Sequence, residues 1–139
     1  MCNAFRGGST KSIAECRKIL RDASASLPEK VGHTVTPVGD AHLDTAWLWP
    51  LAVTELKMSH TTAIHLDLFE RYPEHVFAHS QASQYEWLEK KHPALLERVK
   101  KAAKTGQWEV VGSMWVEADC NLTGAESLVR QFLYGRRYF

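Results

Sequence analysis

The sequence predicts an α/β protein in which short parallel strands alternate with helices. Three short segments rich in apolar and β-branched residues begin near residues 34, 75 and 108, at intervals of about 40 and 33 residues. Between these segments apolar residues recur at helical spacing, and Pro73 and Gly106 end the helical runs. Intervals of this length suit consecutive βα units of a parallel sheet or a barrel.

The composition indicates one globular domain, or part of one, in a chain of 139 residues. Hydrophobic residues make up 45% and charged residues 24%, which argues against disorder, and a formal net charge of +1 argues against a nucleic-acid partner. No apolar run reaches the roughly 18 residues of a membrane helix, so we expect no membrane association. The three cysteines have no C-x-x-C spacing, which indicates no disulfide framework and favours the cytoplasm.

The chain is predicted to begin with a helical lead-in over residues 1–33, followed by the first βα units over residues 34–139. Ser12 and Glu15 have the spacing of a capping box, which satisfies backbone donors at the start of a helix. Apolar residues then continue at helical spacing as far as Pro28, where the helix is expected to stop.

The remaining elements follow from the same signals. Pro37 weakens regular pairing in the first strand, and Thr123 and Glu126 form a second capping box before the last helix. In chain order the predicted elements are a strand over 34–39, a helix over 54–72, a strand over 75–81, helices over 84–92 and 93–106, a strand over 108–116 and a helix opening at 123.

Functional side chains are expected where the three strands end, because ligands bind at the carboxyl edge of a parallel sheet or barrel. These exits have the sequences GDAHLD, HSQASQ and WVEADCN. At the first exit, His42 and Asp44 stand two residues apart, which places both side chains on one face of an extended backbone. Imidazole and carboxylate are ligands that zinc accepts, although a strand-end histidine bonded to its neighbour is favoured on this pattern alone.

The third exit carries two carboxylates, Glu117 and Asp119. Near a cation such a pair suggests a metal ligand, a nucleophile or an acid and base, whereas an aspartate also favours the turn before a helix. If the exits converge as in a barrel, Asp119 approaches His42 and Asp44. The resulting cluster is one ligand short of a tetrahedral zinc site.

Aromatic residues and a further histidine flank these exits. Trp47 and Trp49 follow the first exit, and each is either a core or subunit contact or a platform for the apolar face of a sugar ring. His79 lies at the second exit, where a structural role is favoured over a catalytic one.

Three stretches, in their order and spacing, resemble one known family. They are AHLDTAWLWP, SQASQYEWLEKKHPALLERVK and GSMWVEADCNLTGAESLVRQFLYGRRYF. Together they resemble the start of the catalytic domain of glycoside hydrolase family 38, the α-mannosidases, in the subgroup that includes cytosolic and bacterial enzymes. The resemblance covers about residues 35 to 139.

The resemblance implies the N-terminal portion of a seven-stranded β/α barrel with a zinc ion. In that family the matching residues, here His42, Asp44 and Asp119, hold the zinc, and Asp119 is also the catalytic nucleophile. Trp47 matches the tryptophan that stacks on the sugar. The implied reaction is retaining hydrolysis of α-mannosyl linkages in a mannose-containing oligosaccharide or glycan.

The chain also departs from the family pattern. Asp40 stands where relatives have a histidine, and Val53, Leu56 and His60 replace a customary glutamate and arginines. The family's fourth zinc ligand, a histidine, and its general acid, an aspartate, match no residue before the end of the chain. We therefore expect a truncated barrel that is inactive in isolation.

Two other interpretations stay open at the level of the sequence. The chain could be a degenerate, non-catalytic fragment that binds sugar or metal, or an unrelated metallohydrolase that uses a His-x-Asp site on a similar barrel. The oligomeric state, the linkage specificity and the natural substrate are not indicated by the sequence.

Overall fold

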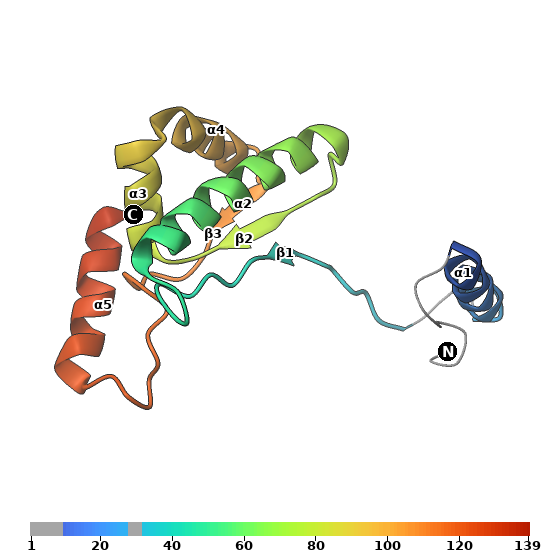
Figure 1. Cartoon of the computed structure of the whole chain (residues 1–139), viewed down its shortest axis with the longest axis horizontal. Helices are drawn as coiled ribbons and strands as arrows, with labels where there is room; N and C mark the ends of the chain where they lie inside the picture. The colour runs from blue at the N-terminus through green and yellow to red at the C-terminus, as the bar shows by residue number, and fades with distance from the viewer. Residues whose placement is uncertain (1–9, 28–31) are drawn as a thin grey trace. The chain divides into compact units, whose positions relative to one another are not determined.

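A computed structural model describes residues 10–27 and 32–139 of the chain. The chain divides into two compact units, Met1–Thr36 and Pro37–Phe139, and each is described here by itself (Figure 1). The first unit contains helix α1, Thr10–Ala25. This helix begins before the predicted capping box, so Ser12 lies inside its first turn; Pro28, its predicted stop, lies outside the described residues.

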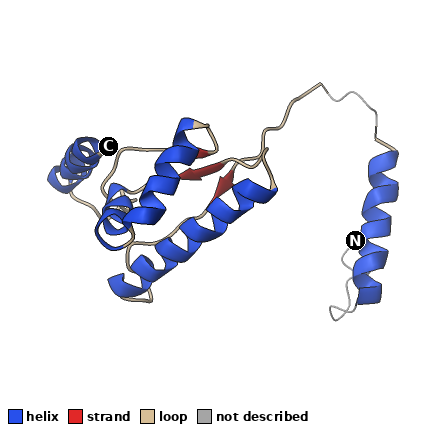
Figure 2. Ribbon diagram, turned by 90° about the horizontal axis from the view of Figure 1, so that it is seen from above, coloured by secondary structure: helices blue, strands red, loops and turns tan. Residues whose placement is uncertain are grey.

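The second unit alternates strands and helices, as Figure 2 shows. Its elements are β1 (Gly39–Asp40), α2 (Leu51–Arg71), β2 (Phe77–His79), α3 (Ala82–Lys91), α4 (Pro93–Lys104), β3 (Trp108–Val110) and α5 (Ala125–Tyr138). The predicted order of helices and strands is therefore confirmed from residue 34 onward. Pro93 opens α4 at its first turn, where the missing N–H of proline costs no helical hydrogen bond.

The three strands form a parallel sheet in the order β1-β2-β3. Gly39 pairs with Phe77, and Phe77 in turn pairs with Trp108. Each strand is shorter than the sequence predicts, because β2 offers partners over only three residues and Gly112, at φ +71°, turns the chain after β3. The sheet confirms an α/β arrangement, and the seven-stranded barrel stays a prediction.

Helices α2, α3 and α4 pack on one face of this sheet through a shared core. On β2, Phe77 and His79 are buried while Ala78 between them is half-buried, so alternate side chains point to opposite faces. Trp108 of β3 joins Phe77 at a ring-centroid distance of 4.8 Å. The core residues are Met58, Leu66, Phe69, Phe77, Tyr85, Leu88, Leu96, Val99, Ala102 and Trp108.

The buried face of α2 is more polar than the sequence suggests. Leu56 and Ile64, two apolar residues of the predicted helix over 54–72, are exposed, whereas Thr54 and Thr62 are fully buried. The Thr62 hydroxyl donates to the Met58 carbonyl oxygen within the helix, so its burial leaves no polar atom unsatisfied. The buried stripe of α2 therefore combines two threonines with the apolar residues Met58, Leu66 and Phe69.

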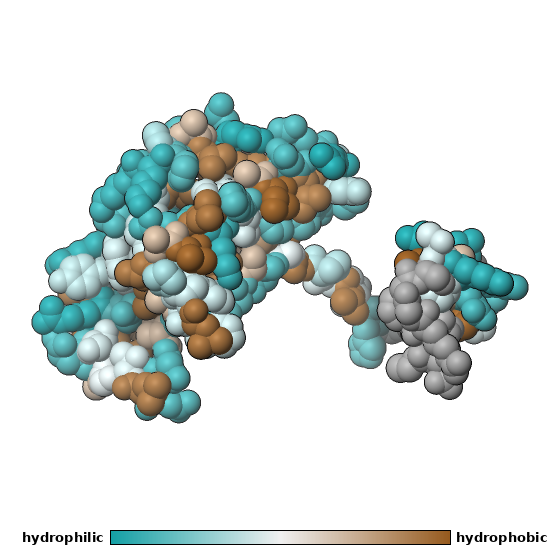
Figure 3. Space-filling model, in the orientation of Figure 1, coloured by the Kyte–Doolittle hydropathy of each residue, from teal (hydrophilic) through white to brown (hydrophobic). Residues whose placement is uncertain are grey.

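Several apolar side chains lie on the surface of the second unit, and brown apolar areas interrupt the teal polar surface in Figure 3. They include Trp47 and Leu48 after the first strand and Val129 and Phe132 on α5. Within the described residues, no helix is both long enough and apolar enough to cross a membrane.

Candidate functional site

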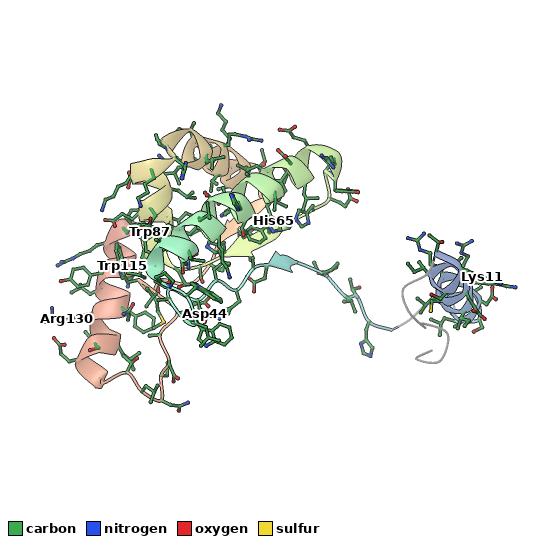
Figure 4. The ribbon with its side chains drawn as sticks, in the orientation of Figure 1. Lys11, Asp44, His65, Trp87, Trp115 and Arg130 are labelled. Atoms are coloured by element: carbon green, nitrogen blue, oxygen red, sulfur yellow. The ribbon has the colours of Figure 1, made fainter. Side chains whose placement is uncertain are left out.

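The predicted site lies where the three parallel strands end. The loop before α2 carries Asp44, which Figure 4 labels. The side chain of Gln81 in the second exit connects this loop to the third exit through hydrogen bonds. Those bonds run from Gln81 to the Leu43 carbonyl oxygen and from the Glu117 backbone N–H to Gln81. The structure thus brings the exits of β1, β2 and β3 together, as the parallel arrangement predicts.

His42 lies between two carboxylates. Its Nε2 atom is 3.1 Å from Asp44 Oδ1, and its Nδ1 atom is 2.7 Å from Glu117 Oε2. The three side chains are 61%, 40% and 41% exposed, respectively. The hydrogen bond with Asp44 raises the pKa of His42 most strongly, the negative charges of both carboxylates add to this effect, and burial opposes it.

Two buried amides from the second exit hold the backbone between the predicted ligands. The Nε2 groups of Gln81 and Gln84 both donate to the Leu43 carbonyl oxygen, at 2.9 and 2.8 Å. Thr45 donates from its hydroxyl to Gln81 Oε1 at 2.7 Å. Because Leu43 lies between His42 and Asp44 in the chain, these bonds hold the backbone segment from which both side chains project.

A buried threonine of α2 holds the same loop from its other side. The Thr54 hydroxyl donates to the Asp44 carbonyl oxygen at 2.9 Å and accepts from the Trp49 indole N–H at 2.9 Å. It also accepts from the backbone N–H of Ala46 at 3.3 Å. Ala46 adopts φ +64°, a left-handed conformation that a residue with a Cβ seldom takes, so the loop is held in a sharp turn.

The two tryptophans of the first exit have different surroundings. Trp49 is half-buried, bonded to Thr54, and covered by the Lys57 ammonium at 3.3 Å from its ring centroid. Trp47 is 65% exposed and meets Trp49 edge-on at 5.3 Å. The structural interpretation therefore holds for Trp49, whereas Trp47, three residues after Asp44, is largely exposed to solvent.

Asp119 lies on an exposed turn of the third exit. Its Oδ1 atom accepts from the Asn121 backbone N–H at 2.8 Å, and its carbonyl oxygen accepts from the Thr123 N–H at 2.9 Å. In the described part of the chain, Oδ2 makes no hydrogen bond, and neither His42 nor Asp44 contacts this carboxylate. The predicted capping box is absent, since Gly124 is the N-cap of α5 and no side chain caps it.

His42 and Asp44 have the spacing that a zinc ion requires of two ligand atoms. Two ligand atoms on tetrahedral zinc lie about 3.3 Å apart, because Zn–N and Zn–O bonds are about 2.0–2.2 Å long. The 3.1 Å between His42 Nε2 and Asp44 Oδ1 fits this spacing. Across residues 10–27 and 32–139, however, no group of three or more His, Cys, Asp and Glu side chains is arranged to hold a metal ion.

The second exit contributes structural residues, of which only His79 is singled out by the sequence. His79 is 1% exposed, its Nε2 atom lies 3.0 Å from Gln84 Oε1, and burial lowers its pKa, all of which agree with a structural role. Tyr85 donates to the His79 carbonyl oxygen and accepts from the Trp108 indole N–H, both at 2.9 Å. The sequence signal that could have identified Gln81 and Gln84 is their i, i+3 spacing, which places both amides on one face at the start of a helix that also carries apolar core residues.

Comparisons with known proteins agree in pointing to one family. Human alpha-mannosidase 2C1 is 46% identical over 107 residues, which cover 77% of this chain and 10% of the relative. An alpha-mannosidase of Saccharomyces cerevisiae is 35% identical over 149 residues, covering 99% of this chain and 14% of the relative. Alpha-mannosidase G of Dictyostelium discoideum is 34% identical over 139 residues, covering 99% and 12%.

The chain thus spans 10 to 14% of the length of these relatives. The family model for the N-terminal domain of glycosyl hydrolases family 38 matches residues 32–139, which include β1, β2, β3 and the loops that follow them. Because this match covers most of the chain, the chain belongs to glycosyl hydrolase family 38, and the matched residues are part of that family's N-terminal domain.

Proposed function

We propose that this chain provides the metal-binding and nucleophilic part of a zinc-dependent retaining α-mannosidase. The observation that carries the proposal is the His42–Asp44 pair, held by buried side chains at a strand exit in a chain of family 38. His42, Asp44 and Asp119 are the proposed zinc ligands. The relatives are named alpha-mannosidases, so the proposed substrate is a terminal α-mannosyl linkage in an oligosaccharide or glycan.

Asp119 is the proposed nucleophile. Its carboxylate attacks the anomeric carbon, the bond from that carbon to the leaving oxygen breaks, and a general acid gives this oxygen its proton. Water then hydrolyses the mannosyl ester and restores the carboxylate, with retention of configuration. Two observations support this role: Asp119 is exposed, and within the described residues its Oδ2 atom accepts no hydrogen bond.

The other residues of the first exit bind and orient the sugar. A zinc ion bound at His42 and Asp44 would supply a positive charge to which sugar hydroxyls coordinate. Trp47 offers an exposed ring on which the apolar face of the sugar can stack. Thr54, Gln81 and Gln84 keep the loop in one conformation, which lowers the entropy lost when substrate binds.

A barrel is the proposed fold for the whole catalytic domain. The parallel strands follow one another in sequence order, and α2, α3 and α4 share a core on one face of the sheet. Barrels keep their helices on one face, whereas doubly wound sheets carry helices on both. The cytoplasmic location remains a prediction from the cysteine pattern.

The alternative is a non-catalytic fragment that binds metal or sugar. One observation favours this alternative: His42 and Asp44 are in contact with each other, whereas Asp119 is hydrogen-bonded within a separate local turn. The two proposals agree on zinc binding at His42 and differ on turnover.

An Asp119→Asn variant of the full protein separates them. The amide oxygen of asparagine can still accept from the Asn121 N–H, so the turn and the stability should be preserved. We expect hydrolysis of an aryl α-mannoside to fall at least about 1,000-fold, since removal of a nucleophile leaves only binding and electrostatic contributions. The first product anomer, followed by NMR, should be the α form.

Asp67→Asn is the matched control, because Asp67 is an exposed carboxylate of α2 that lies 3.7 Å from Arg98. Its activity should equal that of the unmodified protein. Equal activity of the Asp119→Asn and Asp67→Asn variants would exclude Asp119 as nucleophile. Zinc binding without any turnover, in a protein that also carries the general acid, would support the non-catalytic alternative.

A further inference from the structure

Glu117 contacts the ring nitrogen of His42 that does not face Asp44. Glu117 Oε2 lies 2.7 Å from Nδ1, while Nε2 points to Asp44 Oδ1 at 3.1 Å. The two nitrogens lie on different edges of the ring, so a single cation shared by His42 Nε2 and Asp44 does not also reach Glu117 through this geometry. The two carboxylates around His42 therefore have different relations to a bound metal.

Glu117 is itself held in place by the second exit. The Ser80 hydroxyl donates to Glu117 Oε1, and the Glu117 backbone N–H donates to Gln81 Oε1 at 3.3 Å. Gln81 is 2% exposed and its backbone adopts φ +66°, a conformation that costs energy for a residue with a Cβ. The same Gln81 side chain donates to the Leu43 carbonyl oxygen, so it fixes the spacing between the first and third exits.

A neutral imidazole that binds a metal through one nitrogen carries its proton on the other. A carboxylate that accepts this proton selects the tautomer, sets the ring orientation and increases the basicity of the ligating nitrogen. Glu117 meets this description at Nδ1, leaving Nε2 beside Asp44 for the cation. Asp119, two residues further on, bonds its own turn and takes no part in this contact.

We propose that Glu117 is a positioning residue that orients His42 for metal binding through Nε2. The proposal rests on the zinc site proposed above at His42 and Asp44. Glu117 touches neither the metal nor the sugar, and Ser80 and Gln81 hold its carboxylate at the required place. The two carboxylates of the third exit thus have different proposed roles: Glu117 orients His42, and Asp119 binds zinc and attacks the sugar.

Zinc affinity of the full chain tests this role, measured by competition with a chromophoric chelator. Glu117→Ala should weaken zinc binding about 10- to 100-fold, the usual effect of removing such a partner. Glu117→Gln keeps an oxygen that accepts from Nδ1 and should recover part of the loss. Glu109→Ala is the matched control, because Glu109 is an exposed carboxylate on β3 that precedes the same exit loop.

A second measurement detects the orientation of His42 itself. With Co²⁺ in place of zinc, the visible absorption bands should shift in Glu117→Ala and stay unchanged in Glu109→Ala, whereas a purely structural defect would appear as a lower unfolding temperature. Zinc affinity and cobalt spectrum in Glu117→Ala equal to those of the control would overturn the proposal. So would complete loss of zinc in Glu117→Gln, since this would make Glu117 a direct ligand.

The outcome also separates this proposal from the proposed function. If the unmodified chain binds no zinc, or if His42→Ala binds it as well as the unmodified chain, the zinc site itself is wrong and the positioning role falls with it. If His42→Ala loses zinc while Glu117→Ala does not, the zinc site stands and only the role of Glu117 is wrong.

Discussion

The first and third strand exits carry the two halves of the proposed site, and they are held in different ways. The first exit is anchored by buried side chains from two helices, Thr54 of α2 and Gln81 and Gln84 at the start of α3. Its backbone carbonyls, at Leu43 and Asp44, receive hydrogen bonds that water would otherwise supply. The His42–Asp44 pair is therefore preorganised by residues distant in sequence.

The third exit is anchored at its start by α5. The Trp115 N–H donates to the Gln131 carbonyl oxygen at 3.0 Å, and the Val116 N–H donates to Gln131 Oε1 at 2.8 Å. Gly135 brings the same helix against the backbone of Ser113 and Met114. Further along, the Asp119 turn is closed by local bonds.

This difference indicates how the site is divided. The His42–Asp44 pair has its geometry fixed by buried polar groups, whereas among the described contacts the exit that carries Asp119 is fixed only up to Val116 and Glu117. Metal ligands need spacing within a few tenths of an ångström. Asp119, the proposed nucleophile and third zinc ligand, lies on an exposed turn that can adjust when zinc and sugar bind.

The largest effect is expected from Gly135→Ala, which breaks the anchor of the third exit. A Cβ at this position would overlap the Ser113 carbonyl oxygen and lie 2.7 Å from the Met114 carbonyl carbon, and neither backbone atom can move independently. We expect a loss of about 3 kcal/mol or more in the free energy of unfolding, measured by urea denaturation. Gly124→Ala is the control, because its Cβ meets nothing within 4 Å; similar values for the two variants would refute a close approach of α5.

Thr54→Val should have the next largest effect, and it breaks the anchor of the first exit. Valine keeps the shape of threonine but leaves the Trp49 indole N–H and the Asp44 carbonyl oxygen without their partner. The expected loss is about 2 kcal/mol, with weaker zinc binding, because unsatisfied buried polar groups are costly. Thr123→Val in the third exit should change stability by less than about 0.5 kcal/mol. Equal losses at Thr54 and Thr123 would mean that the two exits are held alike.

The sequence predicted the order of elements because proline, glycine and helical spacing mark their ends directly. Pro93 and Gly106 bound α4 and its turn closely. Strand lengths were overestimated, since the apolar residues of 108–116 continue past the point where β2 can pair with them. Pairing depends on the partner strand, which no single segment encodes.

The candidate site was predicted in part. The pairing of His42 with Asp44 follows from their i, i+2 spacing, and the structure places them in contact. The approach of Asp119 to this pair, expected from the convergence of the strand exits in a barrel, stays a prediction. The sequence pairs Glu117 with Asp119 as two carboxylates of one exit, but it does not predict the contact of Glu117 with His42. That contact crosses from the third exit to the first and depends on the sheet order.

The smallest expected effect is the dependence of stability on pH. It differs between the strand exits and the opposite end of the sheet. There His65 Nδ1 lies 3.0 Å from His75 Nε2, and the His65 ring stacks on Phe77 at 3.6 Å. Burial, with the nearby His75 and His79, lowers the pKa of His65 from 6.5 to about 4. At the first exit, by contrast, the pKa of His42 is raised.

The two histidines therefore act on stability with opposite signs. Between about pH 6.5 and 4 the unfolded chain binds a proton that folded His65 does not, so the free energy of unfolding should fall as pH decreases through this range. Because His65 is only half-buried, we expect about 1 to 2 kcal/mol after solvent screening. Contributions from His42 run the other way, being present at low pH and lost as pH rises through its folded pKa. Urea denaturation at pH 7 and pH 5 should show the fall in the unmodified chain and in His42→Gln, and a smaller fall in His65→Gln, because buried His79, whose pKa is also lowered, still contributes. An undiminished fall in His65→Gln would assign the effect to other groups.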